Sequence, residues 1–290
     1  MSNFVDFVTA RRDGMPVHVH NGTFHADDVL SVALLRTIDP SWRVVRTRTL
    51  PKRCFAVDVG GGLYDHHQRI VPRWDTYDTA HCGASRLFTD PHFRKVFGEA
   101  ANLGEPGFRY LEKNLLVPVA QEDNGREGAS PLSWVRYLNP AWNSKASEDE
   151  SFEEAVGTAS TVLSKLIDSA RAAEEAESEL ADLRDTPYQQ IPAGLPGWQE
   201  RLAPTKARFV TYKKDGTWYV QAVPVSAEDR FSMKTPHPES WRGLQSDALS
   251  ARSGIPGAVF CHPSGFISGW KDPLAAHDAA ELAMRLADND

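Results

Sequence analysis

The first part of the chain alternates between two hydrophobic periods, one typical of strands and one typical of a helix. Residues 16–20 (PVHVH), 42–48 (WRVVRTR) and 55–59 (FAVDV) are short runs rich in β-branched residues, which predict strands. Residues 26–38 repeat apolar side chains at intervals of three and four, which predicts a helix. Glycines at 60–62 end the last of these strands. This order predicts an α/β domain with a mostly parallel sheet flanked by helices, whose ligands bind at the carboxyl ends of the strands.

Two further segments have the helical period. Residues 108–116 form the first, and Pro118 is predicted to interrupt the helical region there. Residues 152–183 form the second, again with apolar positions three and four apart. Its strongly charged second half indicates a long amphipathic helix that is partly exposed to solvent and connects two domains.

The pattern changes again after Pro187, where short strands alternate with turn residues. Strands are predicted at residues 208–212, 218–223, 258–261 and 265–270. The sequence KKDG joins the first two as a hairpin, and residues 277–286 predict a terminal helix. The predicted parts are an N-terminal α/β domain (1–150), a connecting helix (151–186) and a smaller C-terminal α+β domain (187–290).

Composition and charge narrow the class of protein. Of the 290 residues, 41% are hydrophobic and 24% are charged, a balance typical of a soluble globular protein. The formal net charge of −7 argues against a tight binder of duplex DNA, although a local basic groove or a bound metal could still attract a polyanion. The sequence has neither a long apolar run nor a recognisable leader, so no membrane association is expected. Three scattered cysteines predict no disulfide framework, and a reducing, cytoplasmic location is expected.

Histidine and aspartate residues are concentrated in four short segments, which carry the candidate chemistry. The segments are HNGTFHADD (20–28), VDVGG (57–61), YDHHQ (64–68) and QEDNG (121–125). Imidazole and carboxylate donors together suit manganese, iron or zinc better than calcium, which prefers oxygen ligands alone. Asp58 ends a predicted strand, where its carboxylate could bridge two cations roughly 3.5–4 Å apart. Each segment alone is compatible with a turn or an ordinary surface histidine, but their conjunction predicts a metal site.

Other catalytic signatures are weak or absent from the sequence. Neither a G-x-S-x-G nucleophile elbow nor a Walker A phosphate loop is present. Cys82 follows His81, which suggests a cysteine hydrolase only as a remote alternative, since adjacent residues of a strand face opposite ways.

The order HNGTFHAD, VDVGG, YDHHQ and EDNG resembles the DHH phosphoesterase superfamily and, within it, the melanocyte-proliferating-gene (Myg) exonuclease family. The resemblance extends into the C-terminal domain through QAVPVS (221–226), WRGL (241–244), SGI (253–255) and SGFISG (264–269). It implies that the first domain is a DHH-type catalytic domain with two manganese ions, for which magnesium, cobalt or zinc could substitute. It also implies that the C-terminal domain binds the substrate.

The resemblance further implies roles for individual residues. One ion would be held by His20, His25 and Asp58, and the other by Asp27, Asp58, His66 and Asp123, with Asp58 bridging. His67 would contact the phosphate or donate a proton to the leaving oxygen, and Asp65 would orient a neighbouring histidine.

The first segment departs from the spacing usual in the superfamily, which has a histidine followed by aspartates four and six positions later. Here His25 occupies the first aspartate position, His20 lies five residues before it, and Asn21 has the four-residue spacing. The first ligand position therefore belongs to His20 or Asn21, with His18 as a weaker alternative. Asp28 stands where the family more often has a glutamate.

In the C-terminal domain, the sequence SGFISG offers backbone N–H groups and small residues that a phosphate or sugar could approach. The predicted substrate-binding residues are Arg242 as a phosphate clamp, Lys234 as a weaker one, and Ser264, Gly265, Phe266, Ser268 and Gly269. Phe266 could stack a base. The alternative is that the glycines serve turns and the neighbouring Trp241 belongs to the core.

Three functions stay open on the sequence alone. The resemblance favours a manganese-dependent 3′–5′ exonuclease that acts on single-stranded or short RNA. The negative net charge favours instead a phosphohydrolase of small phosphoesters, dinucleotides or pyrophosphate. A non-catalytic nucleic-acid-binding module is the third, and it is disfavoured because the expected ligand positions are filled by histidine or aspartate. The oligomeric state is left open, with a homodimer among the possibilities.

Overall fold

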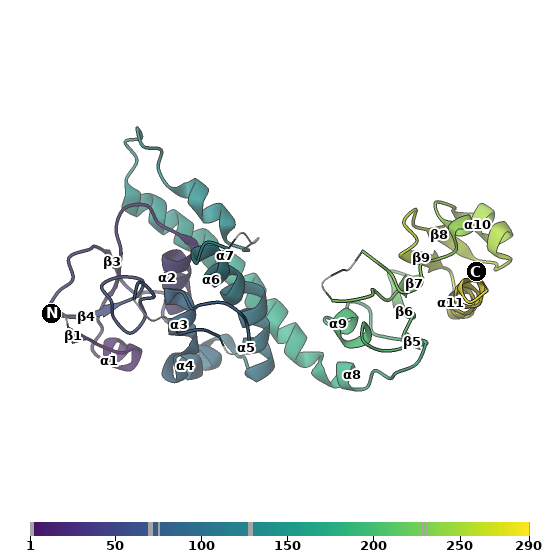
Figure 1. The fold of residues 1–290 in the computed structure, drawn as a ribbon, viewed down its shortest axis with the longest axis horizontal. Helices are drawn as coiled ribbons and strands as arrows, with labels where there is room; N and C mark the ends of the chain where they lie inside the picture. The colour runs from purple at the N-terminus through teal and green to yellow at the C-terminus, as the bar shows by residue number, and fades with distance from the viewer. Residues whose placement is uncertain are drawn as a thin grey trace. The chain divides into compact units, whose positions relative to one another are not determined.

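The computed structural model describes residues 3–68, 72–74, 76–126, 130–227, 229 and 231–289. The chain divides into two compact units, Met1–Glu174 and Glu175–Asp290 (Figure 1). Each unit has its own sheet, and helices pack against it to form a separate apolar core.

The sheet of the first unit has four short parallel strands in the order β1-β4-β2-β3. They are β1 (Asn3–Phe4), β2 (Val17–Val19), β3 (Val44–Arg46) and β4 (Arg53–Ala56). The predicted α/β class with a parallel sheet is thereby confirmed. The strand expected at 55–59 ends earlier than predicted, because Asp58 has a φ of 56° and this left-handed conformation ends an extended strand. The loops after parallel strands meet at one edge of the sheet, where the candidate site lies.

Helix α2 (Ala26–Ile38) has the predicted bounds and forms the centre of this unit. Every residue from Asp27 to Leu35 is buried, and the helix contacts α3 (Gly83–Thr89) and α4 (Pro91–Ala101). A shorter helix, α1 (Phe7–Arg12), packs on α4. The first turn of α2 carries two buried carboxylates, and the positive end of the helix dipole favours negative charge at that place.

A continuous helical segment surrounds Pro118. Helix α5 (Glu105–Leu111) runs into a π-helical turn, η1 (Glu112–Leu116), and then into α6 (Val117–Asp123). The amide of Val117 bonds to the carbonyl of Glu112, five residues back. Pro118 therefore lies in the first turn after a wide turn, where a missing amide hydrogen is tolerated. The predicted break is wrong, and the segment carries Asp123 at its last residue.

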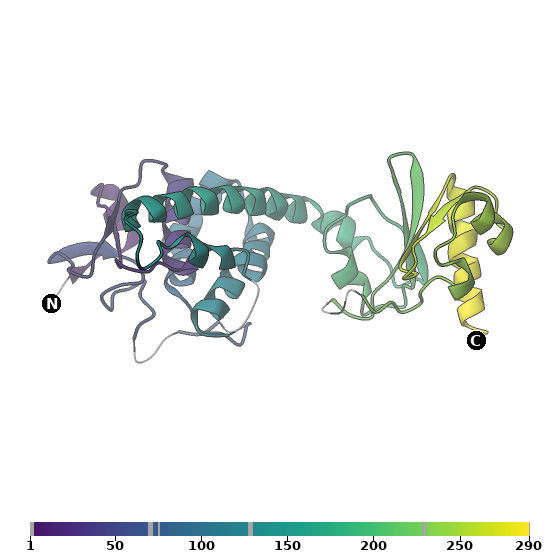
Figure 2. The same ribbon diagram turned by 90° about the horizontal axis from the view of Figure 1, so that it is seen from above.

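Helix α7 (Glu148–Glu175) packs on the first unit along one apolar face (Figure 2). Its buried residues, from Phe152 to Ala170, belong to the same core as α2, and the 3-10 helix η2 (Ser133–Leu138) also contacts α2. The helix predicted at 152–183 is divided, because α7 ends at Glu175 and a short α8 (Glu177–Ala181) follows. The intervening turn lets Leu180 pack into a cluster around Trp198 in the second unit.

The second unit has a five-stranded sheet in the order β5-β6-β7-β9-β8. The strand β5 (Tyr188–Gln190) runs parallel to β6, and the other neighbouring pairs are antiparallel. The four predicted strands are present as β6 (Phe209–Lys214), β7 (Thr217–Ala222), β8 (Ala258–Cys261) and β9 (Ile267–Trp270). Asp215 and Gly216 both have positive φ, as a two-residue hairpin turn requires.

Helices α10 (Ser246–Ser253) and α11 (Pro273–Ala287) pack on this sheet around Trp241 and Trp270. Two short helices, α9 (Trp198–Leu202) and η3 (Glu239–Trp241), complete the unit. Helix α11 begins before the predicted residue 277, because the side chain of Asp272 accepts a hydrogen bond from the Ala275 amide and caps the helix. Within the described ranges, no helix combines the length and apolar character needed to cross a bilayer.

Candidate metal centre

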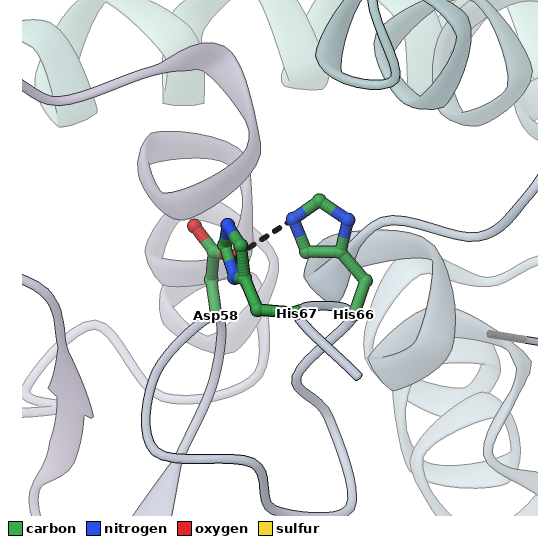
Figure 3. Close-up of side chains that lie close together, drawn as sticks. All are labelled: Asp58, His66 and His67. Carbon is green, nitrogen blue, oxygen red and sulfur yellow. Dashed lines mark ion pairs between the residues drawn. The ribbon is translucent and has the colours of Figure 1, made fainter. Parts of the chain in front are cut away.

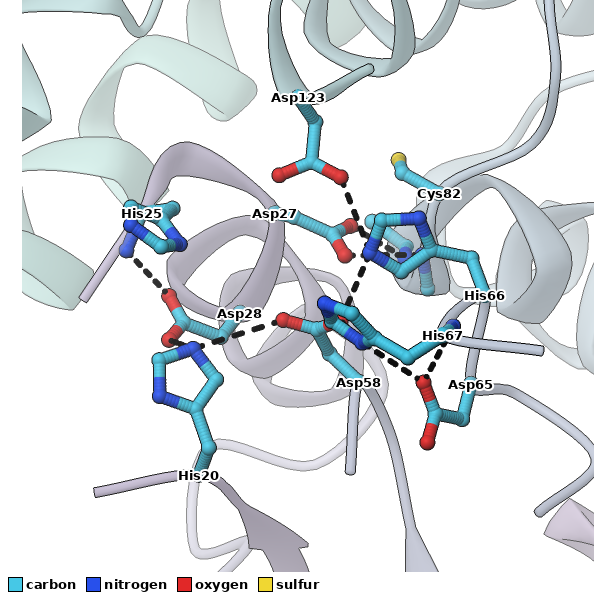
Figure 4. Close-up of polar contacts among 12 residues, drawn as sticks. His20, His25, Asp27, Asp28, Asp58, Asp65, His66, His67, Cys82 and Asp123 are labelled. Carbon is cyan, nitrogen blue, oxygen red and sulfur yellow. Dashed lines mark hydrogen bonds and ion pairs between the residues drawn. The ribbon is translucent and has the colours of Figure 1, made fainter. Parts of the chain in front are cut away.

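Histidines and aspartates from all four sequence segments meet beside the N-terminal end of α2 (Figure 4). Among the residues that the structure describes, three overlapping groups have ligand atoms within 4.8 Å of one another. They are His20–Asp28–Asp58, Asp27–His66–Asp123 and Asp58–His66–His67. Because Asp58 and His66 each occur in two of the groups, the three groups form one continuous cluster.

Asp58 lies at the centre of this cluster on an unusual backbone. Its φ of 56° is left-handed, which costs an L-residue on the order of 1–2 kcal/mol, although aspartate tolerates it better than most residues. Its amide donates to the carbonyl of Tyr64 at 3.0 Å, and Gly60 and Gly61 follow with positive φ. Backbone strain at a buried carboxylate is typical of a functional position.

Asp27 is held by the first amides of α3. The Gly83 amide donates to Oδ2 at 2.8 Å, and the Ala84 amide donates to Oδ1 at 2.6 Å. These bonds and the positive end of the helix dipole offset part of the cost of burying the carboxylate. Each oxygen keeps a second lone pair, so the carboxylate can still coordinate a cation.

His66 lies between two carboxylates. Its Nε2 atom is 3.1 Å from Asp58 Oδ1 and 3.1 Å from Asp123 Oδ2 (Figure 3 shows the pair with Asp58). Both oxygens are buried, and neither has a hydrogen-bond partner among the described residues, because the imidazole approaches them without hydrogen-bond alignment. Buried polar atoms that converge without bonding to one another are the arrangement that a shared cation would satisfy.

The charges of the cluster also fit divalent cations. Burial, together with the neighbouring Asp27, raises the pKa of Asp58 to about 9 and that of Asp123 to about 8. The contact with Asp28, at 2.8 Å, raises the pKa of His20 to about 9. Crowded, buried carboxylates therefore retain protons on their own, and bound divalent cations would displace these protons. Mixed nitrogen and oxygen donors suit manganese, iron or zinc.

His67 is exposed and is oriented by Asp65. Asp65 Oδ1 accepts hydrogen bonds from the backbone amide and from Nδ1 of His67, both at 2.9 Å. Burial opposes the ionised form of Asp65, but the amides of His67 and Gly61 lower its pKa overall. The His67 ring is therefore fixed at Nδ1, and its side chain is 63% exposed, which leaves Nε2 for a substrate.

The structure places the other candidates for the first ligand position as follows. His20 is in the cluster, whereas Asn21 is exposed and His18 is buried in the sheet, with Nδ1 3.0 Å from the Phe55 carbonyl. His25 is exposed, and its ring centroid lies 5.6 Å from that of His20. His25 belongs to none of the three groups of described residues, although it lies beside one of them.

Two residues at this site were not singled out from the sequence. Asp28 is fully buried and takes part in the group with His20 and Asp58. Arg48 lines the same cavity of about 510 Å³ as His20, Asp58 and His66. The sequence signal for Asp28 was its position, where the family more often has a glutamate. The signal for Arg48 was its place two residues after β3, the strand that pairs with β2.

Both predicted phosphate clamps, Lys234 and Arg242, have partners within the protein. Lys234 Nζ donates to the carbonyl oxygens of Leu202, Thr205 and Ala207 at 2.9, 2.7 and 3.0 Å. These bonds use all three of its donors and leave none for a phosphate. Arg242 Nε donates to the His237 carbonyl at 3.0 Å, and its guanidinium lies against Gly265.

The segment SGFISG is only partly accessible, and Gly265, one of the predicted substrate-binding residues, is buried. Ser264 is exposed and Phe266 is half-buried. Ser268 is buried and accepts a hydrogen bond from the Trp270 indole at 2.8 Å, while Gly269 is buried beneath an aromatic ring. A ligand approaching this unit would therefore meet Ser264 and Phe266 rather than the buried Gly265, Ser268 and Gly269.

The structure disfavours a nucleophilic cysteine. Cys82 is fully buried, and burial together with Asp27 and Asp123 raises the pKa of its thiol well above the ordinary value. A thiolate, which is the reactive form, is therefore strongly disfavoured there. The adjacent His81 stacks on Trp74 and bonds to Ser85 at 3.0 Å.

The fold and the cluster define an α/β protein with a histidine–aspartate centre suited to divalent cations. The sequence model of the MYG1 exonuclease family, described as uncharacterised protein family UPF0160, matches residues 16–90 and 117–284. The chain therefore belongs to this family, as the resemblance predicted.

Relatives from distant organisms match most of the chain. The human MYG1 exonuclease is 32% identical over 92% of this chain and 85% of its own length. The MYG1 protein of Chlamydia pneumoniae is 29% identical over 93% and 96%, and that of Schizosaccharomyces pombe is 28% identical over 94% and 98%. Among solved structures, RecJ in complex with Mg²⁺ from Thermus thermophilus aligns with 96% of this chain and 51% of its own, at 16% identity and a TM-score of 0.27.

Proposed function

We propose that the protein is a divalent-metal-dependent phosphodiesterase that removes nucleotides from the end of a nucleic acid. The observation that carries the proposal is the cluster around Asp58, in which histidine and aspartate ligand atoms lie within 4.8 Å of one another. Membership of the MYG1 exonuclease family confirms the prediction that the chain is an enzyme of the hydrolase class.

We assign the cluster to two cations that share Asp58. His20, Asp28 and Asp58 would hold one, with His25 beside it, and Asp27, Asp58, His66 and Asp123 would hold the other. This assignment differs from the sequence-based one in two residues, because Asp28 is added as a ligand of the first ion and His25 lies beside that ion instead of holding it. Bound there, the cations would neutralise phosphate charge and lower the pKa of an attacking water.

The chain's own groups supply the proton for the leaving oxygen. His67 is held at Nδ1 by Asp65 and presents Nε2 to the cavity that it lines. A histidine fixed in this way can donate a proton as the bond to the leaving oxygen breaks. Asp65 acts through His67 and is a positioning residue.

The finer features of the proposal come from the family resemblance and the donor set. Manganese is the proposed ion, with magnesium, cobalt or zinc as substitutes, and single-stranded or short RNA is the proposed substrate, degraded from 3′ to 5′. The second unit would bind the substrate strand through Ser264, Phe266 and Arg242. A cytoplasmic location is part of the proposal, and either a monomer or a homodimer is compatible with it.

A second candidate function is hydrolysis of small phosphoesters, dinucleotides or pyrophosphate. It is favoured by the net charge of −7, which repels long polyanions.

The two functions are separated by a length series of 3′- and 5′-labelled RNA and DNA oligonucleotides, run beside pyrophosphate and dinucleotides with each of the four metals. Shortening of 3′-ends in RNA supports the exonuclease, and turnover of small substrates alone supports the alternative. Binding of oligonucleotides without any hydrolysis would support instead the non-catalytic nucleic-acid-binding module.

A further inference from the structure

Two arginines, one at the end of β3 and one just after it, lie close to Gly22. Arg46 is the buried one, with a side chain only 3% exposed. It donates to the Gly22 carbonyl at 2.5 Å and to Asp149 at 3.0 Å, and its guanidinium lies 4.8 Å from the centroid of the Phe152 ring. All these contacts are internal, so Arg46 holds the loop between β2 and α2 in place.

Arg48 differs from Arg46 in each of these respects. It is exposed, and its Nη2 atom lies 3.9 Å from the position that a Cβ on Gly22 would occupy. Among the residues that the structure describes, none forms an ion pair or hydrogen bond with it. It lines the cavity that contains the metal cluster, on the loop side that carries His20 and His25.

Charge explains why an unpaired guanidinium matters at this place. Five carboxylates belong to the cluster and its support, namely Asp27, Asp28, Asp58, Asp65 and Asp123. Two divalent cations would offset four of these five charges, and the proton that His67 carries as the proposed donor would offset the fifth, so the loaded site has no surplus positive charge to attract an anionic phosphodiester. Arg48 supplies one, and it is the one lysine or arginine among the described residues that line this cavity.

We propose that Arg48 binds the phosphate of the substrate beside the cations, a role that rests on the proposed function. Its planar fork of N–H donors matches two non-bridging phosphate oxygens better than the point charge of a lysine does. The guanidinium lies beside Gly22, and Arg48 lines the cavity into which the phosphate would bind. Arg48 would thus set substrate affinity, whereas Arg46, two residues away, sets the stability of the loop.

The test compares Arg48→Gln and Arg48→Lys with Arg11→Gln, an exposed arginine that lines a different cavity. For a short oligonucleotide, we expect Arg48→Gln to raise KM about 10- to 100-fold, because a charge-assisted hydrogen bond is lost. Arg48→Lys should give an intermediate KM, and the KM of Arg11→Gln should match that of the wild type.

A binding experiment tests the same role without turnover. By calorimetry on the manganese-loaded protein, the Kd of inorganic phosphate should rise at least about tenfold in Arg48→Gln, with an unchanged Kd for manganese. The unfolding midpoint should also be unchanged, whereas Arg46→Gln should lower it.

The readouts separate this proposal from the proposed function. Unchanged phosphate affinity and unchanged KM in Arg48→Gln, in a protein that hydrolyses oligonucleotides, would overturn the role of Arg48 and leave the function standing. Weakened phosphate binding in a protein that cleaves no phosphodiester would support Arg48 as an anion site and overturn the function. A loss of manganese binding in Arg48→Gln would show that the residue supports the loop, as Arg46 does, and would also overturn the proposal.

Discussion

Asp65 bonds to His67 twice through the same oxygen, once at the backbone amide and once at Nδ1, each at 2.9 Å. The paired contact fixes both the rotation of the imidazole and the nitrogen that faces solvent. Asp65→Asn should therefore lower kcat about 10- to 100-fold and leave KM and manganese affinity nearly unchanged. Steady-state kinetics and calorimetry would measure both effects. Asp78→Asn, at an exposed aspartate paired with Arg73, is the control and should behave as wild type. An equal loss of kcat in Asp65→Asn and Asp78→Asn would contradict the role of Asp65.

Removal of the Asp58 charge should abolish metal binding without unfolding the protein. Asparagine has nearly the same shape and tolerates the left-handed backbone, so Asp58→Asn should keep the fold. Manganese at 100 times its Kd should stabilise the wild type by about 2.7 kcal/mol and the variant hardly at all. Elemental analysis and denaturation midpoints with and without manganese are the measurements. Wild-type turnover by this variant would refute the assigned centre.

The same substitution should change how stability of the metal-free protein depends on pH. The folded-state pKa of Asp58, about 9, is above its ordinary value of 3.8, so the folded state binds the proton more tightly than the unfolded state. Wild-type stability should therefore fall as pH rises from about 4 to about 9, and this fall should be smaller in Asp58→Asn. Urea titrations in the presence of a chelator would show it, and parallel pH curves would contradict it.

His237 should give the second unit the opposite dependence on pH. Burial, with a smaller effect from Arg242, lowers its pKa to about 4, and its Nε2 lies 3.1 Å from the Val220 carbonyl. Because only the unfolded state gains the proton between about pH 6.5 and 4, stability should fall by about 3 kcal/mol over that range. His237→Gln can keep the bond to the Val220 carbonyl. The variant should have a lower free energy of unfolding than the wild type at about pH 8, but this free energy should change less between about pH 8 and about pH 4. The prediction fails if the variant and the wild type lose the same free energy of unfolding between those two pH values.

Gly83 is a residue at which a methyl group should disturb the metal centre without removing a ligand. A Cβ there would lie 3.0 Å from Asp27 Oδ2 and 3.1 Å from Asp58 Cβ. Gly83→Ala should therefore weaken manganese affinity at least about tenfold, since ligand positions shift. The control is Gly157→Ala in α7, where no atom lies within 4 Å and where alanine should add about 0.5–1 kcal/mol of stability. Calorimetric manganese titrations of both variants measure the difference, and equal affinities would contradict it.

The parts of the fold that local pattern determines were predictable, and those set by tertiary contacts were not. The helical period of residues 26–38 gave α2 its correct bounds, and the KKDG hairpin was found because turn chemistry is local. The division of the long helix at Ala176 depends on a cluster that contains residues from 191 to 223, which no window along the helix can include. The route of the helix past Pro118 depends on a π turn for which the sequence carries no simple signal.

The same distinction applies to the site. The residue types and their order indicated which four segments meet in the cluster, because few side chains can serve as metal donors. Which atoms meet is a matter of geometry, and so Asp28 entered the cluster while His25 lies at its margin. Lys234 has the right charge for a phosphate ligand, but its three bonds to backbone carbonyls are visible only in the folded chain.

The wide turn at 112–116 has a consequence for the direction in which α6 presents its last residues. Successive residues of an α-helix point about 100° apart, so the register of a helix decides which side chain meets a fixed point. With the extra residue of the π turn, Asp123 faces His66 while its neighbour Glu122 bonds to Ser133 at 2.6 Å. Deleting a single residue from this turn would rotate the end of α6 by about 100°. The Asp123 carboxylate would then point away from His66 and be lost from the cluster.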